Sequence, residues 1–82
     1  MRNLGPVSRA WLAEIGVQDM EDLRRLGSVM AFRAVENHRS GVSLNLLWAL
    51  EGALLDVDCR DLPAGLKQEL RGQVRGGSPS RG

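Results

Sequence analysis

The sequence predicts a small all-α domain, and three observations lead to this prediction. The chain has 82 residues, which is enough for one hydrophobic core and too few for a second independent domain. Apolar residues recur at spacings of three and four, as they do along one face of a helix. Glycines follow three of these segments, at positions where helices commonly end. We therefore expect a compact fold of four to five helices without strands.

The first two helices are expected on either side of a tight turn. The first begins at Pro6, because proline is favoured at the first helical position. Gly16-Val17-Gln18 leaves room only for a hairpin, after which Asp19 suits the N-cap of the second helix. Asp22 follows three residues later, which resembles a capping box. The stripe expected to be buried on the first helix consists of Leu4, Val7, Trp11 and Ile15.

Serine residues are expected to cap the third and fourth helices. Ser28 precedes a helix whose apolar side is Val29, Phe32 and Val35. Ser43 precedes the longest helix, in which leucines cover nearly every side, so this helix should be central. A strip of smaller or polar residues on it permits either exposure or a very close helix neighbour. The strip consists of Asn45, Ala49, Gly52 and Asp56.

The last helix is expected to begin at Pro63 and to be anchored by Leu66, Leu70 and Val74. The helical domain should cover residues 1–75, and a flexible tail rich in glycine, serine and arginine should cover residues 76–82. The five expected helices are Pro6–Ile15, Met20–Leu26, Val29–Arg39, Leu44–Asp56 and Pro63–Arg75.

Few side chains are suited to catalysis or metal binding. The single histidine, His38, lies near the polar end of the third helix, and the single cysteine, Cys59, has no second cysteine to pair with. We expect no enzymatic activity, no cofactor and no metal. The chain lacks a secretory signal and an apolar run of 18 residues, so we expect a cytoplasmic protein. Glu51 is the one charged residue on an apolar side of the central helix, and we expect it to pair with an arginine such as Arg9 or Arg33.

Charge is distributed unevenly along the chain. Residues 1–70 carry a net charge of −2, whereas residues 71–82 carry +3. The folded part therefore does not attract polyanions by charge alone. If nucleic acid is bound, the expected contacts are the mobile arginines Arg71, Arg75 and Arg81. Such binding should be weak and sensitive to salt, because few phosphates are contacted.

The residues around the first turn have the plan of a helix-hairpin-helix unit, with a hydrophobic-Gly-hydrophobic turn between two helices. In DNA-binding versions, the hairpin and the next helix N-terminus present backbone N–H groups to phosphate. Here Asp19, Glu21 and Asp22 lie at that N-terminus and would repel a phosphate. The hairpin is therefore expected to be structural.

Four residues near the hairpin are nevertheless the candidate contacts with a partner or a nucleic acid. Gly16 and Val17 form the turn, and Arg24 and Arg25 follow on the second helix. The acidic neighbours of the two arginines favour a solvated face of mixed charge.

Four segments in this order resemble the C-terminal domain of the TfoX (Sxy) competence-regulator family. They are RNLGP at residues 2–6, WLAEIGV at 11–17, EDLRRLG at 21–27 and VSLNLLWALEGAL at 42–54. The resemblance implies an all-helical domain of the SAM-like, helix-hairpin-helix type. Family members with both domains carry an α/β domain before this one. They are associated with transcriptional activation of DNA-uptake genes in bacteria, with a cyclic-AMP receptor protein as collaborator.

Two function classes stay open at this point. The first is a non-enzymatic protein-interaction module in transcriptional or competence-like regulation, in which an exposed helix face binds a protein partner. The second is a nucleic-acid-binding module that uses the hairpin or the C-terminal arginines. The resemblance provides no catalytic or ligand-binding residues, and the sequence does not indicate an oligomeric state.

Overall fold

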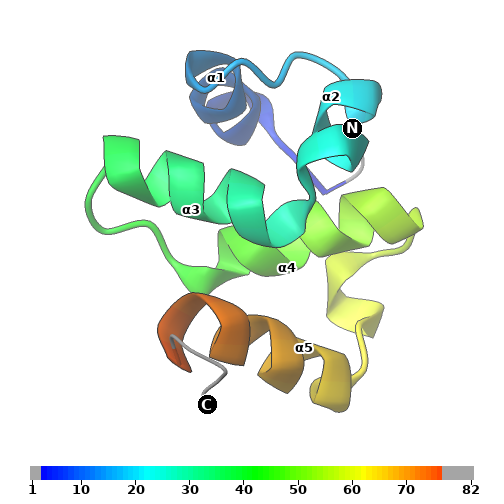
Figure 1. Ribbon diagram of the computed structural model, residues 1–82. Coiled ribbons are helices and arrows are strands. Elements are labelled where there is room, and N and C mark those ends of the chain that lie inside the picture. Colours follow the sequence, from blue (N-terminus) through cyan, green and yellow to red (C-terminus); the bar gives the residue numbers. More distant parts are fainter. Residues whose placement is uncertain (1–2, 77–82) are drawn as a thin grey trace.

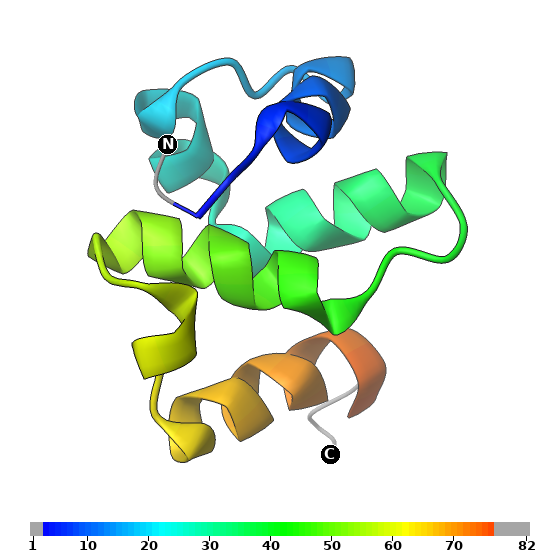
Figure 2. The same cartoon turned by 180° about the vertical axis from the view of Figure 1, so that it is seen from behind.

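The computed structural model describes residues 3–76, and within them it contains helices joined by short loops and no strands. The apolar helix α4 (Leu44–Leu55) lies between α3 (Ser28–His38) and α5 (Ala64–Arg71), as both views show (Figures 1 and 2). The prediction of an all-α fold with a central fourth helix is confirmed. The other elements are α1 (Pro6–Glu14), α2 (Met20–Leu26), the 3-10 helix η1 (Cys59–Asp61) and the π-helical turn η2 (Gly72–Gly76).

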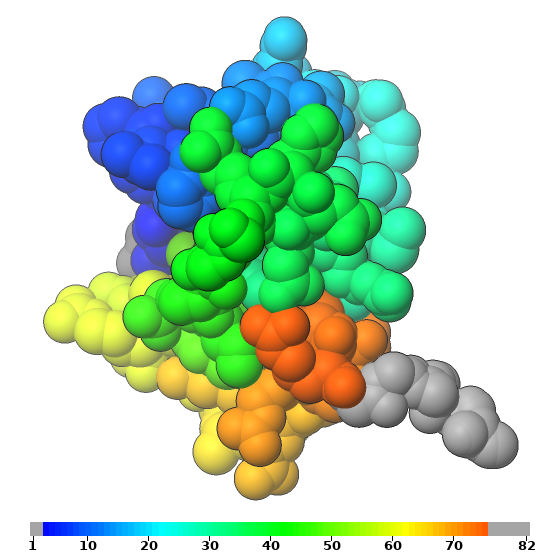
Figure 3. Space-filling view, turned by 90° about the vertical axis from the view of Figure 1, so that its left-hand side faces the viewer, coloured from blue at the N-terminus to red at the C-terminus, as the bar shows by residue number. Residues whose placement is uncertain are grey.

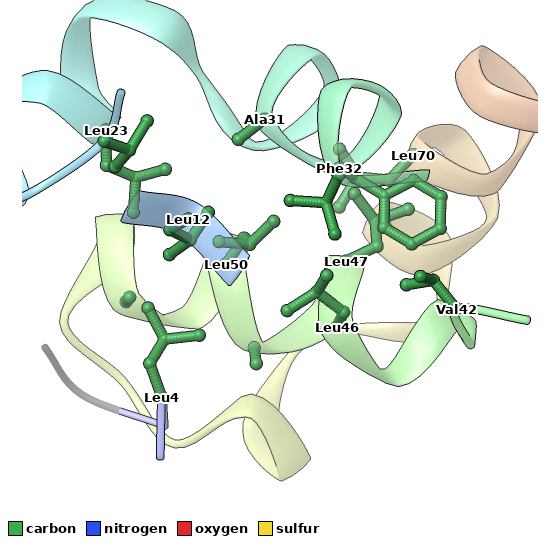
Figure 4. Packing of buried hydrophobic residues seen from close by; sticks show 14 residues of the cluster. Leu4, Leu12, Leu23, Ala31, Phe32, Val42, Leu46, Leu47, Leu50 and Leu70 are labelled. Atoms are coloured by element: carbon green, nitrogen blue, oxygen red, sulfur yellow. The ribbon is translucent and has the colours of Figure 1, made fainter. Parts of the chain in front are cut away.

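The core is built by side chains that several helices direct inward. Figure 4 shows Leu12, Leu23 and Leu50 converging from α1, α2 and α4, with Phe32 of α3 further along the same interior. The largest side chains that are less than 2% exposed are Phe32, Leu12, Leu23, Leu47, Leu50 and Val35. Helix α4 contributes buried residues along its length, which explains why it has no wide polar face.

The stripe expected on α1 is wrong at Val7. Val7 is 62% exposed, whereas Leu12 is fully buried. Leu4 is also buried, and Trp11 and Ile15 pack partly against the core. Spacings of three and four fit two overlapping apolar stripes on this helix, one with Val7 and one with Leu12. The way α1 packs against the core buries the stripe that contains Leu12.

Ser28 is not an N-cap, and Glu51 does not pair with an arginine. Gly27, with a φ of 87°, takes the cap position, and Ser28 is the buried first residue of α3. The Ser28 hydroxyl donates a hydrogen bond to Oε1 of Glu51 over 2.7 Å. Within residues 3–76, Glu51 forms no ion pair. Both predictions are wrong for the same reason. The Ser28 side chain points inward from α3 and forms a hydrogen bond with the Glu51 carboxylate of α4, so it does not cap α3.

The small-residue strip on α4 receives a close neighbour, and this neighbour is not a helix. Nδ2 of Asn3 donates to the Val57 carbonyl oxygen over 2.8 Å, and Oδ1 of Asn3 accepts from the Cys59 N–H over 3.2 Å. A Cβ at Gly52 would lie 2.6 Å from Nδ2 of Asn3 and 2.9 Å from the Val57 oxygen. Glycine at this position therefore permits the N-terminal segment to fasten onto the end of α4.

The C-terminal helix is anchored as expected, but Arg75 is not free. Leu70 is buried, and Leu66 and Val74 pack partly against the core. Arg75 in η2 donates to Oε2 of Glu36 over 2.7 Å, and its guanidinium lies 5.8 Å from the centre of the Phe32 ring. Apart from Gly76, the tail expected at residues 76–82 lies outside the described residues. No helix within residues 3–76 is long and apolar enough to cross a membrane.

Candidate functional site

The α1–α2 hairpin is held by the end of α1. The N–H of Gly16 donates to the Ala13 carbonyl over 3.1 Å, and the N–H of Val17 donates to the Leu12 carbonyl over 2.9 Å. This pair of bonds is a Schellman motif, which requires a left-handed residue, and Gly16 supplies it with a φ of 88°. Val17 is only 3% exposed. The valine therefore anchors the hairpin to the core, and its side chain offers a partner little surface.

Carboxylate oxygens accept hydrogen bonds from backbone N–H groups at the start of α2. Oδ1 of Asp19 accepts from the N–H of Asp22 over 2.9 Å, which confirms Asp19 as the N-cap. Oδ2 of Asp22 accepts from the N–H of Gln18 over 3.1 Å. In a capping box the second bond reaches the N-cap residue itself, whereas here it reaches the residue before it. A phosphate at this place would have to displace carboxylates of its own sign.

Two shallow depressions flank the turn. The larger has a volume of about 470 Å³ and is lined by Arg9, Ala13, Val17, Gln18, Asp19 and Met20. The smaller has a volume of about 200 Å³ and is lined by Ile15, Gly16, Val17, Asp22, Arg25 and Leu26. Each combines apolar side chains with one arginine and one aspartate. They are suited to contact with side chains of a protein and do not enclose a small molecule.

The two arginines of α2 differ in their surroundings. Arg25 lies 3.5 Å from Asp22 and 3.9 Å from Glu21, measured between guanidinium nitrogen and carboxylate oxygen. Arg24 is exposed and forms no ion pair with another described residue. Arg24 is thus the candidate contact residue on α2 whose charge is not offset locally.

Arg71 and Arg75 lie far from the hairpin. Figure 1 shows α5 and η2 on the opposite side of α4 from the α1–α2 turn. Arg71 and Arg75 line a depression of about 420 Å³ with Gln68 and Gly72. Arg75, expected to be mobile, pairs with Glu36 over 2.7 Å, so part of its charge is already offset. Arg81 lies outside the described residues.

Ion pairs offset much of the positive charge on the described surface. Arg39 of the α3–α4 loop binds Glu14 of α1 through two hydrogen bonds of 3.2 and 2.6 Å. The bond from Arg39 lowers the pKa of Glu14 below its ordinary value. Asp58 likewise raises the pKa of Arg60, chiefly through a hydrogen bond between the two side chains. Residues 3–76 hold nine basic and ten acidic side chains, a net charge of −1.

A further groove, which the sequence does not predict, lies between α1, the loop before α4, α4 itself and η1. It has a volume of about 470 Å³, and Trp11, Leu46 and Ala49 are among its lining residues. The lining residues come from separate parts of the chain, among them Asn3, Trp11 and Cys59, and no local pattern in the sequence shows that they meet. Within residues 3–76, no three side chains of the types His, Cys, Asp and Glu gather where they could hold a metal ion.

The sequence matches the TfoX C-terminal domain over residues 1–74. The chain belongs to the TfoX C-terminal domain family. Protein Sxy of Escherichia coli strain K12 is 36% identical over 61 residues, which is 74% of this chain and 29% of Sxy. The chain therefore spans less than a third of the length of this relative. The resemblance expected from the four sequence segments is confirmed.

Two crystal structures of proteins from Listeria monocytogenes share the fold. One is an uncharacterized protein in a triclinic form, with a TM-score of 0.87 and 28% identity, covering 99% of this chain and 94% of that chain. The other is a protein of unknown function in a tetragonal form, with a TM-score of 0.85 and 29% identity, covering 93% of each chain. The arrangement of helices around α4 is thus shared by structures in which the domain makes up nearly the whole chain.

Proposed function

We propose that this TfoX C-terminal domain is a non-enzymatic regulatory module that binds a protein partner. The partner binds the surface around the α1–α2 turn, called the hairpin face below. The setting proposed is the transcriptional regulation of DNA uptake that the family resemblance implies. The nearest candidate partner is the cyclic-AMP receptor protein, the collaborator that the same resemblance implies. Because the chain spans only 29% of Sxy, activities that require the rest of such a protein are not included.

One observation carries the choice of protein over nucleic acid. A phosphate would use two N–H groups that already have acceptors: the N–H of Asp22 donates to the carboxylate of Asp19, and the N–H of Gln18 donates to the carboxylate of Asp22. Glu21 adds a third carboxylate to the same helix end. Carboxylates and phosphate compete for the same positive end of the helix dipole. Phosphate binding here is therefore disfavoured both by the occupied N–H groups and by repulsion from the carboxylates.

The surroundings of the turn support a protein partner. The larger of the two depressions beside the α1–α2 turn offers apolar surface from Ala13 and Met20 next to the guanidinium of Arg9. Arg9, like Arg24, forms no ion pair with another described residue. Apolar surface bordered by arginine is typical of protein interfaces, where arginine is enriched and fixes the register of the partner.

The second candidate, nucleic-acid binding, is favoured by a different observation. Arg71 is exposed on α5 beside a depression, and the chain continues to Arg81. The ion pair of Arg75 with Glu36 leaves fewer free charges there than the sequence suggests. Binding by these groups would be weak and nonspecific, because too few phosphates are contacted.

The test is binding of the 82-residue chain to purified cyclic-AMP receptor protein, measured by surface plasmon resonance. Arg9→Glu and Arg24→Glu should each weaken the complex by roughly tenfold or more, as arginine contacts at interfaces do. Arg33→Glu is the matched control, because Arg33 is an exposed arginine that lies on α3, outside the α1–α2 hairpin that carries Arg9 and Arg24, and it lines neither depression. Binding that Arg33→Glu weakens equally would contradict the hairpin face. Failure of the receptor to bind at all would contradict this partner.

A further inference from the structure

The hairpin face has two sides, and they differ in free charge. On one side, Arg9 and Ala13 of α1 and Met20 of α2 line the larger depression. Arg24 follows Met20 by four residues, so these two side chains share one side of α2. Arg9 and Arg24 are both exposed, and neither forms an ion pair with another residue in the range 3–76. This side, called the basic side below, therefore carries two arginines without an ionic partner.

On the other side of the hairpin face, the arginine already has acidic neighbours. Asp22, Arg25 and Leu26 of α2 line the smaller depression there. Guanidinium nitrogens of Arg25 lie 3.5 Å from a carboxylate oxygen of Asp22 and 3.9 Å from one of Glu21. Two of the three carboxylates near the start of α2 are thus next to Arg25. A charged group of a partner gains more on the basic side, where the arginines are unpaired.

The packing of α1 leaves its part of the basic side open. Arg9 and Ala13 are four residues apart and share one side of α1, and both are exposed. The side of α1 with Trp11 and Glu14 is already in contact with Arg39. The guanidinium of Arg39 binds Glu14 through two hydrogen bonds and lies 5.3 Å from the centre of the Trp11 ring. Figure 3 shows this part of the chain (green) lying against α1 (blue).

We propose that the basic side binds an acidic segment of a protein partner, in which an apolar side chain lies between carboxylates. The carboxylates pair with Arg9 and Arg24, and the apolar side chain packs on Ala13 and Met20. Apolar contacts next to arginine are characteristic of the residues that contribute most to binding at protein interfaces. This inference rests on the proposed function, because it names the chemistry of the partner that the hairpin face binds.

The order of residues along the basic side restricts the partner further. Ala13 and Met20 lie near the turn, and each arginine lies four residues further along its helix. The apolar side chain of the partner therefore lies at the turn, where Asp19 also lines the depression. The carboxylates of the partner lie one helical turn away from Asp19, which reduces their repulsion. A nucleic-acid backbone offers no apolar group to cover Met20, so it fits this side less well.

The test is an NMR titration of the 82-residue chain with two synthetic helical peptides, each up to about 1 mM, which detects binding as weak as this concentration. Both peptides carry one leucine, which is flanked on the same helix face by glutamates in the first peptide and by lysines in the second. The glutamate peptide should shift the amide resonances of residues 9–13 and 20–24, and the lysine peptide should not. No shifts with the glutamate peptide, or equal binding of both peptides, would overturn the proposal.

Variants of two adjacent arginines test which side of the hairpin face is used. Arg24→Gln should raise the dissociation constant of the glutamate peptide by roughly threefold or more, and Arg9→Gln should do the same. Arg25→Gln is the matched control, because Arg25 lies on the same helix but is next to Asp22 and Glu21. Circular dichroism verifies that the variants are helical. An effect of Arg25→Gln as large as that of Arg24→Gln would contradict binding on the basic side.

Two further titrations separate this inference from nucleic-acid binding and from the proposed function. A short DNA duplex that shifts the same amides more than the glutamate peptide does, at physiological salt, would overturn the proposal in favour of a nucleic acid. If the glutamate peptide binds and the cyclic-AMP receptor protein does not, the inference holds and the proposed partner is wrong. If the receptor protein binds and the glutamate peptide does not, the inference is wrong and the proposed function holds.

Discussion

Asp56 ends α4 in a conformation that favours glycine. Its φ is 59°, and the next residue, Val57, donates its N–H to the Gly52 carbonyl over 2.9 Å. Because a Cβ is strained in this left-handed region, Asp56→Gly should raise the free energy of unfolding by about 1 kcal/mol. Urea denaturation measures the change. A lower free energy of unfolding would mean that the Asp56 side chain stabilises the helix end by more than its conformation costs.

Asp19 is the residue that closes the start of α2. Asp19→Ala leaves the Asp22 N–H without its acceptor and should lower the free energy of unfolding by roughly 0.5–2 kcal/mol. Asp19→Asn keeps an acceptor oxygen in the same place and should cost much less. Equal losses in both variants would show that charge, and not the capping bond, is responsible.

Residues whose partners are close in sequence could be predicted, and those with distant partners could not. Asp19 and Ser43 are caps as expected, because a cap bonds to a backbone N–H two or three residues further on. Asn3 bonds to residues 54 and 56 positions away, and no local pattern indicates such contacts. Ser28 failed for the same reason, since its partner Glu51 is 23 residues away.

The central position of α4 can be tested by shortening its side chains. Leu47 and Leu50 are fully buried, so replacing either with alanine should lower the free energy of unfolding by roughly 2–5 kcal/mol. Leu55 on the same helix is 51% exposed and is the matched control, for which the loss should be well below this range. The three variants are compared by thermal unfolding. Similar losses at all three positions would mean that α4 is not buried on the side described.

The contact between α1 and the end of α3 should depend on pH. The hydrogen bond from Arg39 lowers the pKa of Glu14 in the folded state. A carboxyl of this kind stabilises the fold above its unfolded pKa, and the stabilisation is lost as pH falls through the folded pKa. Glu14→Gln should therefore lower the melting temperature slightly at about pH 7 and have no effect at about pH 2, where both chains lack the charge. A difference that stays constant with pH would contradict this.

Helix positions were predictable to within a few residues, but the rotation of a helix was not. The expected bounds of α1, α2 and α4 agree closely with those observed, because apolar spacing and capping residues are local signals. Val7 was misplaced because the inward face of α1 is decided by the helices against which it packs. At Arg75 the sequence suggested the end of a mobile segment, whereas contacts with α3 hold it.

At the scale of the whole molecule, the fold was predictable and its surface was not. Length, helical periodicity and the four family-like segments indicated the all-α domain. The groove lined by Trp11 and Ala49 depends on how separate segments assemble, so composition and motifs do not reveal it. The hairpin could be judged in part from sequence, because its carboxylates are adjacent to the N–H groups that they occupy.

The central claim is that the hairpin of this domain does not bind phosphate, because carboxylates occupy its N–H groups. Titration of a labelled DNA duplex with the 82-residue chain at low and at physiological salt tests this most directly. We expect weak binding at low salt, a slope of log affinity against log salt no steeper than about −2.7, and no detectable binding at physiological salt. Tight, sequence-dependent binding at physiological salt that is lost in Gly16→Ala would contradict it, because the folded hairpin would then be the DNA reader.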